Sequence, residues 1–100
     1  MKCTINKMAA KVINEVLASE QGQGKMLRIA VTHKHADHAH YGLGLDVKGE
    51  HDEVVQTESG IPVLLDSREE LLDGVSVQYM TVPNEGFIIT NKAKGNDGSH

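Results

Sequence analysis

The spacing of apolar residues changes once along this chain, and that change is what most restricts its fold. Between Met8 and Leu17, apolar side chains recur at intervals of one and four residues, as on one face of an amphipathic helix. Asn6 is a suitable N-cap, and the Gly-Gln-Gly at 22–24 ends the pattern. From Leu27 onwards, apolar residues instead alternate with polar ones. We therefore expect one long helix at 6–19, followed by a strand-rich remainder.

Short turns divide the strand-rich part of the chain. The expected strands are 27–32, 41–47, 53–57, 62–66, 75–82 and 86–91, and a short helix capped by Ser67 is expected at 67–72. Residues 93–100 contain no apolar side chain except Ala93, which predicts a mobile tail. The pattern predicts a single domain at 1–92. Its class is mostly β (α+β): a small mixed β-sandwich or barrel with one long N-terminal helix and one short helix.

Composition and charge restrict the partners of the chain. The net charge is −4 at pH 7, and Lys and Arg form no cluster, so we expect no nucleic-acid binding. No apolar run approaches the roughly 20 residues of a membrane span, and the N-terminus lacks the apolar core of a signal peptide. We expect a cytoplasmic protein. The single cysteine, Cys3, excludes an intrachain disulfide and is expected to be buried as a small apolar side chain.

Four of the six histidines lie in the sequence Thr-His-Lys-His-Ala-Asp-His-Ala-His at 32–40. Imidazole and carboxylate groups are common ligands of divalent transition metals. The candidate metal ligands are His33, His35, Asp37, His38 and His40. If both flanking strands were regular, His33 and His35 would share a face with Ile29, while His38 and His40 would lie opposite Tyr41. The four imidazoles can then converge only through an irregular loop near Ala36, or through a second subunit.

The histidine segment also permits two other interpretations. One is a solvated polar loop that binds nothing. The other follows from the letters T-H-x-H-x-D-H, which resemble the first metal-binding string of the metallo-β-lactamase fold. That fold is longer and takes further ligands from distant segments, whereas this chain has only His51 and His100 outside the segment. We expect His51 in a surface turn and His100 at the end of the tail. A metallohydrolase-like zinc site is therefore the more distant alternative, and we expect no catalytic residues and no enzyme.

Several short strings together resemble the A-type iron–sulfur carrier family, also called HesB/IscA-like. In order along the chain they are AA at 9–10, LRIAV at 27–31, YGLGLD at 41–46, GIPVLLD at 60–66, LLDG at 71–74 and NEGFIITN at 84–91. The resemblance covers nearly all of the chain and implies a HesB-like domain. It also implies a role in iron–sulfur cluster biosynthesis, because the family binds iron or a cluster and delivers it to other proteins. The candidate partners are an iron–sulfur assembly or target protein and a second copy of the chain.

The family binds its cluster with three cysteines, and this chain has none of them. The corresponding positions fall on Ala36, Gly98 and His100. Because iron–sulfur clusters are held mainly by thiolates, we expect no cluster here. The histidine segment surrounds the family's metal position, so the resemblance implies a divalent transition metal, iron or zinc, bound by a histidine-rich loop. The alternative is a family member that has lost the metal site and acts as an interaction or regulatory protein.

Overall fold

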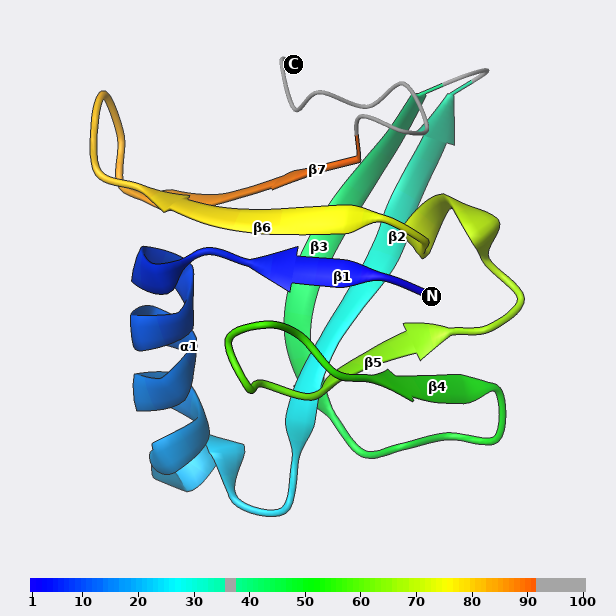
Figure 1. Cartoon of the computed structure of the whole chain (residues 1–100), viewed down its shortest axis with the longest axis horizontal. Coiled ribbons are helices and arrows are strands. Elements are labelled where there is room, and N and C mark those ends of the chain that lie inside the picture. The colour runs from blue at the N-terminus through cyan, green and yellow to red at the C-terminus, as the bar shows by residue number, and fades with distance from the viewer. Residues whose placement is uncertain (36–37, 92–100) are drawn as a thin grey trace.

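The computed structural model is a mixed α+β fold, in which two sheets and one α-helix of the described residues share a core (Figure 1). The structure describes residues 1–35 and 38–91, and it describes His35 and His38 by their backbone only. The elements are β1 (Cys3–Ile5), α1 (Lys7–Ala18), η1 (Glu20–Gly22), β2 (Met26–His35), β3 (His38–Asp46), β4 (Asp52–Val55), β5 (Val63–Asp66), η2 (Glu70–Leu72), β6 (Val75–Met80) and β7 (Gly86–Thr90).

The long N-terminal helix is confirmed as α1. Asn6 is its N-cap, because the Asn6 side chain accepts a hydrogen bond of 2.9 Å from the backbone N–H of Ala9. Ala9 and Ile13 of the predicted apolar face are buried, as is the neighbouring Ala10, whereas Met8 and Val16 of that face are exposed. The helix ends where Ser19 becomes extended and its N–H donates back to the carbonyl of Val16.

Both sheets are mixed. One has the strand order β1–β6–β7, with β1 parallel to β6 and β7 antiparallel to β6. The other has the order β3–β2–β5–β4, with β2 parallel to β5 and antiparallel to β3. The sequence did not predict β1. It has only three residues, and its register pairs Cys3 with Val75, so no local pattern reveals it.

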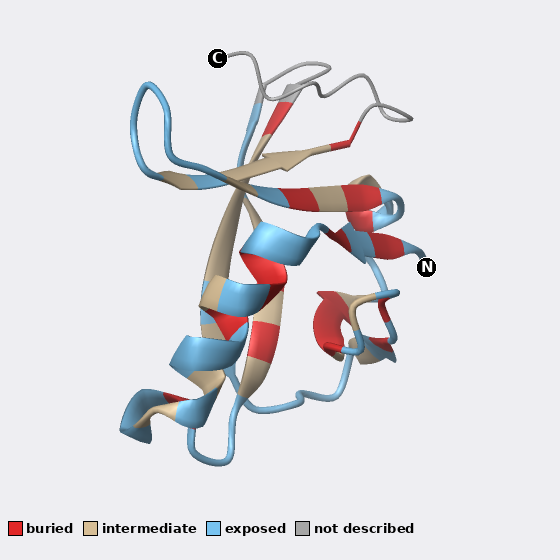
Figure 2. Cartoon of the chain, turned by 60° about the vertical axis from the view of Figure 1, so that its left-hand side comes forward, coloured by how far each residue is buried: buried red, intermediate tan, exposed pale blue. Residues whose placement is uncertain are grey.

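The core lies between the two sheets and the inner face of α1, where Figure 2 shows buried residues on facing surfaces. Ile5, Ile29, Val63 and Val77 come from four different strands and are each at most 2% exposed. Cys3 is 5% exposed and belongs to the same cluster, as expected. Burial, together with a smaller effect of the Glu58 carboxylate, raises the pKa of its thiol to about 12. The thiol is therefore neutral and shielded at neutral pH.

The predicted short helix at 67–72 is wrong in extent and in type. The structure has a single 3₁₀ turn there, η2, and its N-cap is Glu69 rather than Ser67. Two local contacts prevent an earlier start: the Ser67 hydroxyl donates to the carbonyl of His51, and the Asp66 carboxylate accepts from the N–H of Arg68. The predicted tail at 93–100 lies outside the described residues. Within residues 1–35 and 38–91, no helix has both the length and the apolar character that membrane crossing requires.

Candidate metal-binding hairpin

Strands β2 and β3 form one long antiparallel ribbon that carries the histidine segment. Their pairing runs from Met26 opposite Asp46 to His35 opposite His38. Most of the predicted loop is therefore strand, and the connection between the strands, Ala36 and Asp37, lies outside the described residues. At about 3.3 Å per residue, the ten residues of β2 extend roughly 30 Å, in a molecule whose extents are 38, 37 and 22 Å. In Figure 1 the ribbon crosses the whole fold.

The ribbon contains one irregularity, and it falls at the start of the histidine segment. Val31 pairs with Tyr41, but the next pair is His33 with His40. Between these two pairs, β2 is longer by one residue than β3, and Thr32 is the extra residue of a β-bulge. Because successive side chains alternate between faces, the bulge puts His33 on the face opposite Val31. The strands are therefore not regular here, and His33 does not share the face of Ile29 as it would in a regular strand.

The bulge brings His33 and His40 together. Their ring centroids are 6.0 Å apart, and the ring planes are tilted by 53°. With metal–nitrogen bonds of about 2.0–2.1 Å, two imidazoles on one tetrahedral metal have centroids roughly 5.2 Å apart, so these two rings need to approach by less than about 1 Å to share an ion. His33 is exposed and His40 is half-buried, so an ion from solvent can reach the pair. This spacing is compatible with two imidazoles on one metal.

The remaining predicted ligands lie beyond this pair. His35 and His38 pair with each other in the backbone register, two residues further along each strand. Their side chains, and Asp37 as a whole, are outside the described part of the chain. Among the side chains that are described, no three of His, Cys, Asp or Glu form a group that could hold a metal. Of the five candidate ligands, only His33 and His40 have side chains that the structure describes.

The opposite face of the same segment is anchored to η2. Lys34 Nζ lies 2.6 Å from Glu69 Oε2, and the Lys34 ammonium holds the pKa of that carboxyl below its usual range. The Tyr41 hydroxyl donates to the carbonyl of Leu71 at 2.8 Å. Ala39, between the two histidines of β3, is only 6% exposed. No local pattern in the sequence indicates these anchors, because Glu69 lies 35 residues after Lys34 and Leu71 lies 30 residues after Tyr41.

Two further histidines, His51 and His100, lie outside this hairpin in the sequence. His51 is exposed in the turn before β4, as predicted, and its carbonyl accepts from Ser67. His100 lies outside the described residues.

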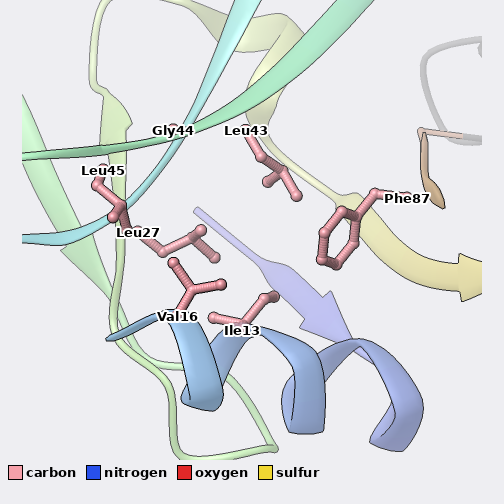
Figure 3. A pocket seen from close by; sticks show the side chains of 7 residues that line it. All are labelled: Ile13, Val16, Leu27, Leu43, Gly44, Leu45 and Phe87. Carbon is pink, nitrogen blue, oxygen red and sulfur yellow. The ribbon is translucent and has the colours of Figure 1, made fainter. Parts of the chain in front are cut away.

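An apolar hollow lies between α1 and the β2–β3 ribbon (Figure 3). Its volume is about 140 Å³, and its lining is apolar: Ile13, Val16, Leu27, Leu43, Gly44, Leu45 and Phe87. Binding and catalytic pockets combine apolar walls with a few convergent polar groups. None of the described residues that line this hollow has a polar side chain, so they offer no group for acid–base, nucleophilic or metal chemistry.

No protein-family model matches this chain, and no curated protein matches it in sequence.

Proposed function

We propose that the chain is a HesB/IscA-like protein that binds one divalent transition metal, iron(II) or zinc, at the tip of the β2–β3 ribbon. It is not an enzyme, and it holds no iron–sulfur cluster. The observation that carries the proposal is the bulged register, which sets His33 opposite His40 with ring centroids 6.0 Å apart. Two imidazoles at this spacing need one or two further ligands to hold a transition metal.

The backbone register suggests where those ligands come from. Positions 35 and 38 are paired two residues beyond the pair of His33 and His40. Because strand positions alternate with a period of two, all four histidine positions belong to one side of the ribbon. A metal-bound imidazole usually donates its second ring N–H to a carboxylate or carbonyl group. Asp37, next to His38 in the sequence, is the proposed partner or an additional ligand.

Two of the strings on which the HesB-like assignment rests meet in the fold. Among the strings that resemble the family, LLDG at 71–74 and NEGFIITN at 84–91 are the more specific. In the fold they touch: the side-chain amide of Asn91, which is fully buried, donates to the carbonyls of Leu71 and Asp73 at 2.9 and 2.8 Å. The two strings thus form one structural unit. By the same resemblance, we propose a cytoplasmic protein that delivers its metal to an iron–sulfur assembly or target protein and pairs with a second copy of itself.

Calorimetric titration tests the metal site. Zinc, iron(II) and nickel are titrated into the protein without a His tag, into a His33→Ala/His40→Ala double variant, and into a matched His51→Ala control. We expect one metal per chain in the wild type and the control, and binding at least about tenfold weaker in the double variant. If all three proteins bind alike, with a Kd no better than about 1 mM, the segment is a polar hairpin only. The alternative, an interaction or regulatory protein without a metal, would then be preferred.

Anaerobic reconstitution with iron and sulfide tests the absence of a cluster. We expect no visible charge-transfer band after desalting, because Ala36, Gly98 and His100 stand where thiolates are required. Cys3 cannot replace them within one chain, since its thiol is buried in the core. A band that survives desalting would contradict this part of the proposal.

A further inference from the structure

We infer that Thr32 and Gly42 are positioning residues for the metal site, because together they hold the bulge that decides which face of the ribbon carries His33. This inference rests on the proposed metal site and names the two residues that assemble it. Bulges of this kind re-aim side chains near functional sites. Neither residue offers a strong metal ligand of its own.

The bulge changes the face of every β2 residue beyond it. Before the bulge, Leu27 and Ile29 point into the core and are at most 4% exposed. With regular alternation His33 would lie on that same face, and His40 on the other. Lys34 provides independent evidence of the change. It pairs with the buried Ala39 and reaches Glu69 on the inner side, which a regular strand would not allow.

Two contacts of Thr32 hold the bulge. Its hydroxyl donates to the carbonyl of His40 at 3.2 Å, which links the extra residue to the opposite strand. Its methyl group lies over Gly42, where an added Cβ would be 2.8 Å from Thr32 Cγ2. Threonine is stiff about χ1, so the methyl group can leave only if the hydroxyl also turns and gives up His40. Gly42 therefore provides the space that the bulge needs.

Gly44 is a matched control in the same strand. It is two residues further on, in the same YGLGLD string, and a Cβ there would meet nothing within 4 Å. A second variant can restore what the first disrupts. Thr32→Ser keeps the hydroxyl and removes the methyl group, so it should relieve the clash that Gly42→Ala creates.

The experiment compares Gly42→Ala, Gly44→Ala and Thr32→Ser/Gly42→Ala with the wild type. Zinc affinity is measured by calorimetry, and the register is read in the zinc-free protein from backbone nuclear Overhauser contacts between residues 33 and 40. We expect Gly42→Ala to weaken zinc binding about tenfold or more, as loss of a supporting residue does, and to lose the 33–40 contact. Gly44→Ala should leave both unchanged, and Thr32→Ser/Gly42→Ala should recover both.

Deletion of Thr32 tests the same inference without adding a side chain. It keeps all the proposed ligands and Gly42, and it removes the extra residue itself, so His33 follows Val31 directly and stays opposite His40. Zinc binding and the 33–40 contact should therefore survive. Loss of zinc binding in this deletion, or wild-type affinity in Gly42→Ala, would overturn the inference. Failure of the wild type to bind zinc would instead overturn the proposed function, and the 33–40 contact would still report whether Thr32 and Gly42 set the register.

Discussion

The β2–β3 ribbon has two halves that are built differently, although one pair of strands runs through both. The proximal half, 26–30 with 42–46, packs Leu27 and Ile29 into the core and pairs with β5. The distal half, 31–35 with 38–41, contains the bulge, carries histidines on one face and is tied to η2 by Lys34 and Tyr41. Burial thus fixes the proximal half without any ligand. The distal half keeps polar groups at the surface, where they are available for binding.

The contrast between the two halves would be refuted if both contributed equally to the free energy of unfolding. Ile29→Ala should lower the free energy of unfolding by about 2–5 kcal/mol, because it opens a cavity at a fully buried position. His33→Ala/His40→Ala should change it far less in the absence of metal, by about 0.5 kcal/mol, because His33 is exposed and His40 is only half-buried. Urea unfolding measures both. A loss in the histidine variant as large as that in Ile29→Ala would mean that the distal half is structural.

Metal should stabilise the fold through the distal half alone. Zinc at 100 times its Kd should raise the free energy of unfolding by about 2.7 kcal/mol, by mass action. The same increase should appear in Ile29→Ala, whose distal half is intact, and should disappear in His33→Ala/His40→Ala. Thermal unfolding with and without zinc checks this. If zinc stabilised the double variant equally, its site would lie elsewhere in the chain.

Acid should affect the two halves in different pH ranges. In the proximal half, the Arg28 guanidinium holds the pKa of Asp52 below its ordinary value of 3.8, and the Asp52 side chain is only 6% exposed. A lowered pKa gives stability that is fully present above the unfolded value and is lost as the pH falls through the folded one. This loss should therefore begin below about pH 4. The zinc-dependent increase in the free energy of unfolding should be lost at a higher pH, below about pH 6, because protons compete with metal for imidazole.

Unfolding free energies measured from pH 7 to pH 3, with and without zinc, separate these two ranges. Asp52→Asn is the control for the first of them. It should cost about 1.5–3 kcal/mol at neutral pH, since it weakens charge-assisted hydrogen bonds, and should flatten the loss in acid. An unchanged acid profile in this variant would show that another carboxyl group dominates.

The smallest expected effect concerns the link between the distal half and η2. Tyr41→Phe removes one hydrogen bond to the carbonyl of Leu71 and should cost about 0.5–1.5 kcal/mol. The value should fall in the lower part of that range, because the Leu71 carbonyl also accepts from Asn91. Chemical denaturation measures the cost. A much larger loss would mean that the distal half is part of the cooperative core after all.

The sequence predicted the proximal half well and the distal half poorly, for physical reasons. Leu27, Ile29 and Leu43 follow the alternation that burial of one face demands, and α1 follows its own apolar spacing, so both could be read locally. The bulge at Thr32 could not be predicted from the local sequence. It depends on a missing Cβ at Gly42 and on an ion pair between Lys34 and Glu69, residues that meet only in the folded chain. The kinds of ligand in the histidine segment were readable, but the face they occupy was not.

The parallel pairing of β1 with β6 has a consequence for how the protein is made. Cys3 and Ile5 belong to the core, yet the strand that pairs with them is Val75–Met80, near the other end of the described chain. On a ribosome, β1 therefore has no partner until most of the chain has been synthesised. Contacts between such distant segments also slow folding, because a long loop must close before they form. Until then, the apolar face of α1 remains uncovered by β6, which makes the nascent chain a candidate for chaperone binding during translation.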